Sequence, residues 1–162
     1  MSHGRSRTGG IAVLTVSDTR DSATDTSGAL ARELLAAAGH RIVASAILPD
    51  EPELVSEQVL RWIADDDVDA IVITGGTGIA RRDRTYEAVV GVLDQRLDGF
   101  GELFRALSFD EIGSRAMLTR AVGGIARGTV VFALPGSTAA VQLGVERLLV
   151  PELAHVFGEL DR

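Results

Sequence analysis

The sequence predicts a three-layer α/β/α domain built on a mostly parallel, doubly wound sheet. Short apolar runs such as 11–16 (IAVLTV) and 68–74 (VDAIVIT) are typical of strands that are covered on both faces. Segments with apolar residues at helical spacing alternate with these runs, and Gly- or Pro-containing turns separate them. No repeat or linker interrupts this alternation, so we expect a single domain over residues 10–162.

The elements follow in order along the chain. Strands are expected at 11–16, 41–48, 68–74, 116–125 and 129–134, the last two joined through Gly128. The expected helices cover about 25–38, 51–63 and 85–97, and a last one follows 135–137. Asp25 or Ser27 is the N-cap of the first helix, and Gly39 ends it.

Helical spacing assigns the inward faces of these helices. They are Leu30 and Leu34 in the first, Val55, Val59, Trp62 and Ile63 in the second, Val89, Leu93 and Leu97 in the third, and Val141, Val145, Leu148 and Leu149 in the last.

Length and composition fit a globular protein. The chain has 162 residues, of which 46% are hydrophobic and 24% charged. No apolar run has the length of a membrane span, and the polar, Gly-rich start MSHGRSRTGG lacks the apolar stretch of a signal peptide. We therefore expect a cytoplasmic protein with a disordered tail over residues 1–9.

Missing residue types narrow the chemistry. The chain has no Cys, and all 16 of its basic residues are Arg. This excludes disulfides, thiolate nucleophiles, Schiff bases and the Lys of a P-loop. His3, His40 and His155 lie far apart, which disfavours a His-metal cluster. Carboxylates, Arg, hydroxyls, backbone amides and a hard metal ion remain.

The net charge of −7 argues against a nucleic-acid surface, which is normally basic. Residues 50–69 contain eight acidic residues and only one Arg, so this segment alone carries a charge of −7. We interpret it as a solvated helix face followed by an acidic loop.

Three turns follow expected strands: Ser17-Asp18, 74–78 and 134–137. If the strands are parallel, these turns share the edge of the sheet where ligands bind in α/β proteins. The middle turn consists of Thr74, Gly75, Gly76, Thr77 and Gly78. Its glycines allow a phosphate to approach several backbone N–H groups, although a plain strand-to-helix turn explains it equally well.

Arg81, Arg82 and Arg84 follow this turn and indicate a polyphosphate or acidic-ligand site. Asp83 among them is either the N-cap of the next helix or a magnesium ligand, and Asp50 has the same two interpretations. Taken locally, the cap is favoured for both.

A further segment, Gly99-Phe100-Gly101-Glu102, begins another helical stretch. Phe100, Leu103 and Phe104 are expected in the core or in a subunit interface. Ser108, with Glu111 three residues later, fits a capping box.

Seven segments in this order resemble the MoaB/Mog family of molybdenum cofactor biosynthesis proteins, whose fold is also that of gephyrin-like G domains. They are SDTR at 17–20, LPDE at 48–51, TGGTG through RRD at 74–83, TYEA at 85–88, GFGELFRALSFDEIG at 99–113, LTRA at 118–121 and LPGS at 134–137. The resemblance covers nearly the whole chain from about residue 10. The 99–121 block is closer to the MoaB branch, and Ile79 and Tyr86 stand where the adenylyltransferase pattern often has Pro.

The resemblance implies transfer of an adenylyl group from Mg²⁺-ATP to molybdopterin. Asp50 and Asp83 match the acidic positions tied to magnesium and catalysis. The 74–78 turn matches the phosphate-binding turn, and Gly101 with Glu102 matches the motif that borders it. Ser17, Asp18, Pro135, Gly136 and Ser137 match turns that line the nucleotide and pterin pocket.

The resemblance also implies a homotrimer or a dimer of trimers, and contacts with other enzymes of the pathway. Two alternatives to the adenylyltransferase stay open. One is a non-catalytic protein that holds molybdopterin or its adenylyl form. The other is a different nucleotide-processing activity on the same fold.

Overall fold

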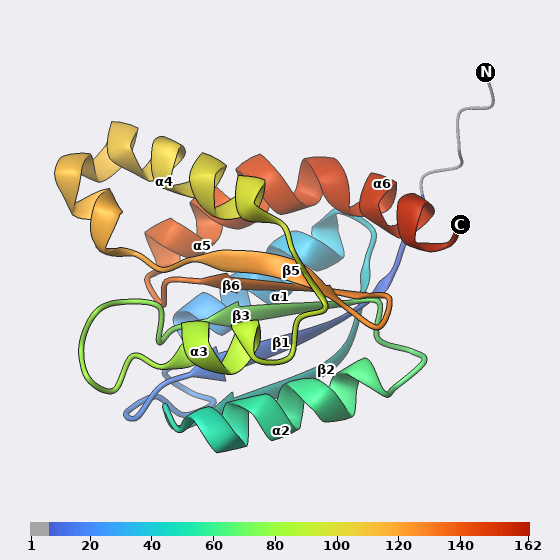
Figure 1. The fold of residues 1–162 in the computed structure, drawn as a ribbon, viewed down its shortest axis with the longest axis horizontal. Coiled ribbons are helices and arrows are strands. Elements are labelled where there is room, and N and C mark those ends of the chain that lie inside the picture. The colour runs from blue at the N-terminus through green and yellow to red at the C-terminus, as the bar shows by residue number, and fades with distance from the viewer. Residues whose placement is uncertain (1–6) are drawn as a thin grey trace.

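The computed structural model describes residues 7–162 and contains one six-stranded sheet, in the order β2-β1-β3-β6-β5-β4 (Figure 1). The four parallel strands are β1 (Gly10–Val16), β2 (Arg41–Leu48), β3 (Ala70–Thr74) and β6 (Thr129–Leu134). Two further strands form antiparallel pairs: β5 (Val122–Ala126) pairs with β6, and β4 (Gln95–Arg96) pairs with β5. The predicted fold class is confirmed.

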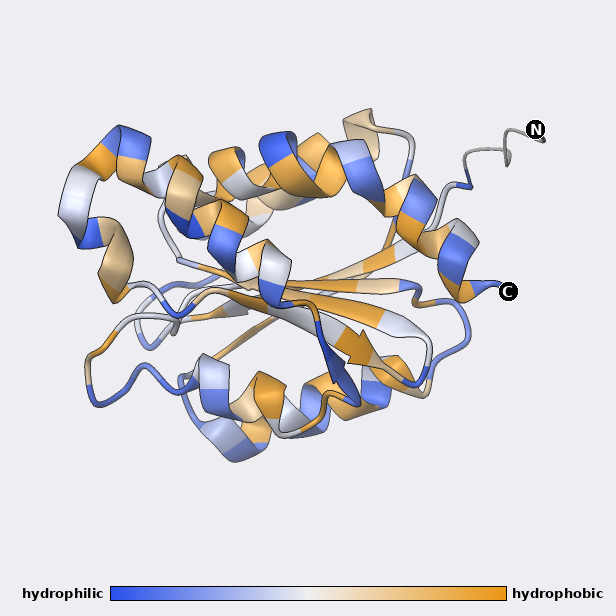
Figure 2. Ribbon diagram, turned by 45° about the horizontal axis from the view of Figure 1, so that its top comes forward, coloured by the Kyte–Doolittle hydropathy of each residue, from blue (hydrophilic) through white to orange (hydrophobic). Residues whose placement is uncertain are grey.

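Helices cover both faces of the sheet (Figures 1 and 2). One face packs against α1 (Thr26–Ala37), α4 (Asp98–Ile112), α5 (Thr138–Gly144) and α6 (Val150–Leu160). The other packs against α2 (Pro52–Ile63) and α3 (Thr85–Val90). A 3₁₀ segment, η1 (Gly113–Leu118), follows α4, and a π-helical segment, η2 (Val145–Leu149), joins α5 to α6. Among the helices of residues 7–162, none combines the length and the hydropathy of a membrane-spanning segment.

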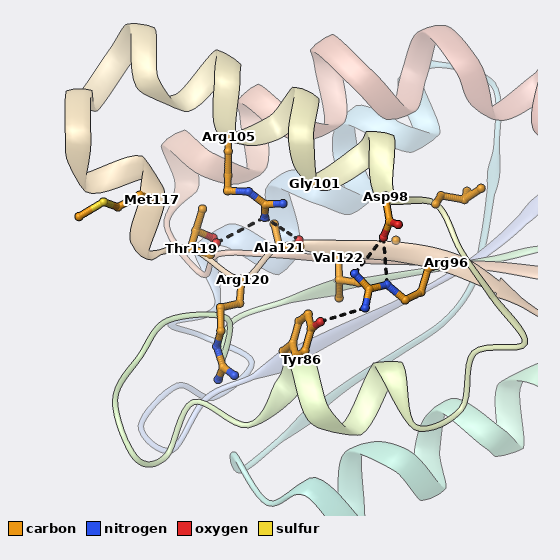
Figure 3. Close-up of a pocket in the computed structure, with 12 residues that line it drawn as sticks. Tyr86, Arg96, Asp98, Gly101, Arg105, Met117, Thr119, Arg120, Ala121 and Val122 are labelled. Carbon is orange, nitrogen blue, oxygen red and sulfur yellow. Dashed lines mark hydrogen bonds and ion pairs between the residues drawn. The ribbon is translucent and has the colours of Figure 1, made fainter.

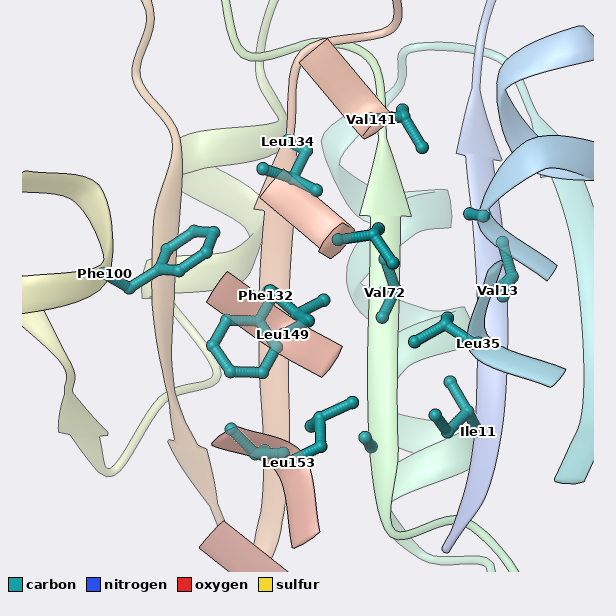
Figure 4. Packing of buried hydrophobic residues seen from close by; sticks show 14 of the residues in the cluster. Ile11, Val13, Leu35, Val72, Phe100, Phe132, Leu134, Val141, Leu149 and Leu153 are labelled. Atoms are coloured by element: carbon teal, nitrogen blue, oxygen red, sulfur yellow. The ribbon is translucent and has the colours of Figure 1, made fainter. Parts of the chain in front are cut away.

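The strands supply a core on each side of the sheet, because successive side chains point to opposite faces. Ile11 and Val13 belong to the cluster under α1, α4, α5 and α6, which Figure 4 shows from close by. Ala12 and Leu14 belong to the cluster under α2 and α3. In the first cluster the ring centroids of Phe100 and Phe132 lie 4.8 Å apart.

The predicted inward faces are confirmed for α2, where Val55, Val59, Trp62 and Ile63 are all buried. In α1 the prediction is off by one residue. Ala31 and Leu35 are fully buried, whereas Leu30 and Leu34 lie partly buried at the edge of the same core. Of the two N-cap candidates for α1, Asp25 is the cap, and it accepts a hydrogen bond from the Gly28 amide at 3.0 Å.

The helix predicted over 85–97 is wrong in its second half, because α3 ends at Val90. The Asp94 amide donates to the Ile125 carbonyl at 2.9 Å, and the Leu97 amide to the Gly123 carbonyl at 2.8 Å. The chain therefore leaves the helix to pair with β5 as an edge strand, so bonds to a segment about 30 residues away outweigh the local helical pattern.

The strand predicted over 116–125 begins only at Val122, because Ala116–Leu118 belong to η1. Arg127 and Gly128 join β5 to β6 with φ values of 50° and 83°. Positive φ at both turn residues is typical of tight hairpins, and it makes β5 antiparallel to β6.

The capping box predicted at Ser108 is wrong, because Ser108 is buried in the middle of α4. Phe100 and Phe104 belong to the core, so the alternative of a subunit interface is wrong for these two residues. Leu103, in contrast, is 57% exposed.

The predicted disordered tail falls mostly on residues 1–6, which lie outside the described residues. Residues 7–9 of that range contact the domain. Arg7 forms ion pairs with Asp69 and Asp161, and its guanidinium lies over the Phe157 ring. The Gly9 amide donates to Nδ1 of His40 at 3.2 Å.

Candidate functional site

The three turns singled out in the sequence lie together at the carboxyl edge of the sheet. In the register of the parallel strands Thr15 pairs with Thr74, and Thr74 with Leu134, so β1, β3 and β6 end side by side. A cavity of about 280 Å³ opens between the turns. The predicted site residues on its wall are Ser17, Thr74, Gly75, Gly76 and Gly136.

The turn after β3 requires glycine at two positions. Gly75 and Gly76 have φ values of 98° and 72°, which L-residues with side chains rarely adopt. A Cβ on Gly75 would lie 2.1 Å from the Val16 carbonyl oxygen, and one on Gly76 would lie 2.1 Å from Thr85 Oγ1. The sequence therefore has glycine at these two positions for steric reasons.

Not every amide of this turn is available to a ligand. The Gly75 amide donates to the Leu134 carbonyl at 2.9 Å, within the sheet. Within residues 7–162 the amides of Gly76, Thr77 and Gly78 have no protein acceptor. The phosphate-binding turn predicted over 74–78 thus has three donors, at 76–78.

Asp50 is buried and lies beside this turn. One of its oxygens accepts from the Arg84 amide at 3.2 Å, and the other would lie 2.7 Å from a Cβ on Gly76. Burial raises the pKa of Asp50, and the charges of Asp83 and Asp18 raise it further. The predicted N-cap is wrong, because Glu51 occupies the cap position of α2.

Asp83 approaches the same turn from the loop before α3. Its Oδ2 accepts from the Ala80 amide at 2.9 Å and would lie 2.8 Å from a Cβ on Gly78. The N-cap of α3 is Arg84, so the predicted cap is wrong here too. Two carboxylates from different loops therefore flank Gly76 and Gly78.

This pair fits a magnesium ion. Within residues 7–162 there is no group of three or more His, Cys, Asp or Glu that could hold a metal by itself. Proteins usually bind Mg²⁺ through one or two carboxylates, while substrate phosphates and water complete the shell. Asp50 Oδ2 and Asp83 Oδ1 accept no hydrogen bond from the described chain, so both oxygens are available.

Asp18 lies beside this pair but not on the cavity wall. Its carboxylate accepts from Nε and a terminal nitrogen of Arg82, at 3.0 and 2.8 Å, and from the Asp50 amide at 3.0 Å. The hydrogen bonds from Arg82 and Asp50 lower the pKa of Asp18 to about 2. Its bonds thus tie the loop after β1 to the loops that carry Asp50 and Asp83.

The turn after β6 contacts the loop after β1. The Gly136 carbonyl accepts from Ser27 Oγ at 2.8 Å and from Arg20 at 3.1 Å. Ser137 is exposed and is the N-cap of α5, where it accepts from the Ala140 amide at 3.1 Å. Pro135 precedes these two residues and is half-buried. Arg20, the last residue of the SDTR segment, received no role in the sequence analysis, although it lines the edge cavity.

Gly101 and Glu102 lie in the first turns of α4, away from the edge cavity. Gly101 lines a second cavity, of about 400 Å³, between α3 and α4 (Figure 3), and Glu102 is exposed. The structure therefore does not bring these two residues to the wall of the cavity beside the glycine turn.

Sequence reasoning missed Arg120, which connects the two regions. Its amide donates to the Thr77 carbonyl at 2.6 Å, and its Nε to the Gly78 carbonyl at 3.0 Å. The terminal nitrogens donate to the Asp83 carbonyl and to the Glu87 carboxylate. The only signal was its place in the LTRA segment, because its partners lie 33 to 43 residues earlier in the chain.

Fold and site together define a class of protein: a three-layer α/β domain with an amide-lined turn and two carboxylates at the carboxyl edge of its parallel strands. Residues 12–155 match a family model described as "Probable molybdopterin binding domain". The chain belongs to this family and, within it, to the molybdenum cofactor biosynthesis proteins B.

Individual relatives agree with this assignment. Molybdenum cofactor biosynthesis protein B of Halalkalibacterium halodurans is 50% identical over 149 residues, which cover 91% of this chain and 88% of the relative. The Bacillus cereus protein of the same name is 48% identical over 151 residues, with 93% and 89% covered.

Solved structures agree as well. A crystal structure of a molybdenum cofactor biosynthesis protein B has a TM-score of 0.94 at 46% identity and covers 97% of this chain and 98% of its own. A MogA structure reaches 0.85 at 29% identity, with 93% and 99% covered. These identities agree with the expected likeness to the MoaB branch.

Proposed function

We propose that this protein acts in molybdenum cofactor biosynthesis as a molybdopterin adenylyltransferase, which converts Mg²⁺-ATP and molybdopterin to adenylyl-molybdopterin and pyrophosphate. Membership of the molybdopterin-binding family supports the pterin substrate. The observation that carries the proposed reaction is the pair Asp50 and Asp83 beside the glycine turn.

The reaction needs no protein nucleophile. A phosphate oxygen of molybdopterin attacks the α-phosphorus of ATP and forms a new P–O bond. The bond from the α-phosphorus to the bridging oxygen breaks, and its electron pair leaves with pyrophosphate. Because the attacking phosphate is ionised at neutral pH, no general base is required, which suits a chain without Cys or Lys.

The residues of the edge have distinct proposed roles. The amides of Gly76, Thr77 and Gly78 donate to phosphate oxygens and stabilise the charge that develops on them. Asp50 and Asp83 hold a magnesium ion, which neutralises charge on the phosphates when it is bound. Binding of the phosphates thereby fixes the reacting atoms in line.

The turns around the edge cavity are the proposed site of the pterin and nucleotide rings. Ser17 Oγ accepts from the Thr19 and Arg20 amides at 3.2 and 3.1 Å, which holds the loop after β1 in a compact turn. Gly136 lines the same cavity, and Arg20 bonds to its carbonyl. These bonds preorganise the wall before a ligand arrives.

The deciding experiment incubates the protein with Mg²⁺-ATP and molybdopterin and measures released pyrophosphate. We expect turnover that depends on both substrates and stops when EDTA removes magnesium. Binding of both ligands without pyrophosphate release would favour the alternative, a protein that holds molybdopterin without transforming it.

We also propose that the chain forms a homo-oligomer through α4 and η1. Five large apolar side chains there are at least 40% exposed: Leu103, Phe109, Ile112, Met117 and Leu118. Large apolar side chains that stay exposed on two adjacent elements are typical of a protein–protein interface. Light scattering at micromolar concentration is expected to give a multiple of the 17.1 kDa chain mass, and a monomer would contradict this prediction.

A further inference from the structure

The cavity between α3 and α4 differs in chemistry from the cavity at the sheet edge. It has a volume of about 400 Å³, within the usual range of small-molecule sites. Its wall contains three basic residues, Arg96, Arg105 and Arg120, and one acidic residue, Asp98. Figure 3 shows these side chains around the opening.

Arg105 differs from the other two because no carboxylate compensates its charge. Arg96 pairs with Asp98, and Arg120 with Glu87. Arg105, in contrast, forms no ion pair within residues 7–162.

The hydrogen bonds of Arg105 also leave donors unused. One terminal nitrogen donates to the Ala121 carbonyl at 3.1 Å and to that of Thr119 at 3.5 Å, while Nε and the other terminal nitrogen have no acceptor in the described chain. A half-buried guanidinium with unused donors and no counter-ion favours an anionic ligand.

Thr119 supplies an independent observation on the same wall. Its Oγ1 is buried and has no hydrogen-bond partner among the described residues. Buried hydroxyls are nearly always hydrogen-bonded, so an unpartnered one beside a cavity indicates a missing acceptor or donor. The hydroxyl itself is covered, so a ligand oxygen held by Arg105 would become its partner once the Thr119 side chain rotates toward the cavity that this residue lines.

Gly101 explains how Arg105 fits along the wall. A Cβ at this position would lie 2.7 Å from a terminal nitrogen of Arg105 and 2.8 Å from the Ala121 carbonyl oxygen. Any larger residue would therefore displace the guanidinium from its place against α4. The glycine thus serves the position of Arg105, although it does not reach the glycine turn after β3.

We propose that this cavity binds the phosphate group of a phosphorylated small molecule, with Arg105 and Thr119 as its donors. A planar guanidinium with two unused donors matches the geometry of phosphate oxygens. Tyr86 and Met117 supply an apolar wall for the organic part of that molecule. Only the identity of the ligand, a nucleotide or a phosphorylated pterin, rests on the function proposed above.

Equilibrium binding without magnesium tests this site separately from catalysis. Isothermal titration with pyrophosphate, AMP and molybdopterin compares the parent with Arg105→Gln, and tighter binding of AMP or molybdopterin identifies the source of the phosphate. We expect Arg105→Gln to weaken the preferred ligand about 10- to 100-fold, as typical for loss of a charged hydrogen bond.

Two further variants sharpen the result. Gly101→Ala keeps the charge but displaces the guanidinium, so it is expected to weaken binding in the same direction. Arg61→Gln is the control, because Arg61 is exposed on α2 and does not line the cavity. Equal affinities of parent and Arg105→Gln for all three ligands would overturn the proposal, as would an equal loss in Arg61→Gln.

The two proposals fail in different ways. If the protein releases no pyrophosphate but binds a phosphorylated ligand through Arg105, the result supports this binding site and contradicts the proposed activity. If the protein is an active enzyme but its ligand affinities do not depend on Arg105, the result supports the proposed activity and contradicts this binding site.

Discussion

Nε of Arg120 donates to the carbonyl oxygen of Gly78 at 3.0 Å, and this bond joins the strand connection before β5 to the turn after β3. The same guanidinium also reaches the Asp83 carbonyl and the Glu87 carboxylate. One side chain therefore bonds both to the glycine turn and to the loop that carries Asp83, a carboxylate of the site.

The first prediction concerns this side chain. Arg120→Lys keeps the charge but cannot make these divergent bonds, so we expect faster hydrogen exchange of amides 78–84 and a loss of turnover of about 10- to 100-fold. Arg61→Lys, an exposed change on α2, is the control. Unchanged exchange in 78–84 would show that Arg120 does not hold the loop.

The second prediction concerns the two carboxylates. Asp50→Asn and Asp83→Asn keep an oxygen acceptor for the Arg84 and Ala80 amides but remove the charge that binds magnesium. We expect each variant to lower pyrophosphate release about 100-fold or more. Thermal unfolding is expected to change little, since neither residue is a helix cap and both keep their hydrogen bonds.

Asp66→Asn is the matched control, because Asp66 is exposed in the acidic loop before β3. It is expected to leave turnover unchanged. If both site variants retain turnover within a few-fold of the parent, the carboxylates have no part in the reaction.

The third prediction concerns the glycine turn. Gly76→Ala places a Cβ at a φ of 72°, 2.1 Å from Thr85 Oγ1 and 2.7 Å from Asp50 Oδ2. We expect the free energy of unfolding to fall by about 1–3 kcal/mol.

Gly99→Ala is the comparison for this change, since a Cβ there meets nothing within 4 Å and position 99 lies in α4. Its stability is expected to equal or exceed that of the parent by up to about 1 kcal/mol. Chemical denaturation measures both variants, and similar effects at 76 and 99 would contradict the steric argument.

The fourth prediction concerns acid stability. Burial lowers the pKa of His40, whose Nδ1 accepts a hydrogen bond from the Gly9 amide. The unfolded chain therefore binds a proton more readily than the folded one. This contribution to stability is complete above the unfolded pKa of about 6.5 and decreases as the pH falls toward the lowered folded value.

Urea denaturation between pH 8 and 5 checks this for the parent and for His40→Gln, which keeps an acceptor but does not titrate. We expect the stability of the parent to decrease more steeply with acid than that of the variant. Parallel curves would mean that His40 does not contribute to the pH dependence.

Features that depend only on neighbouring residues followed from the amino-acid sequence alone. Continuous apolar runs identified β1, β3 and β6, which are buried along their whole length. Helical spacing identified the buried face of α2 at Val55, Val59, Trp62 and Ile63. Glycines after β3 marked the turn, and the ordered segments marked the family.

Which residues meet across the sheet, in contrast, became clear only from the assembled fold. Local rules assigned Asp50 and Asp83 as helix caps, yet both lie beside Gly76 and Gly78 because parallel strands end at one edge. Likewise, the end of α3 and the bonds of Arg120 depend on the pairing of β4 and β5. These partners lie about 30 or more residues apart, and no local pattern encodes a register that is fixed only when the whole sheet assembles.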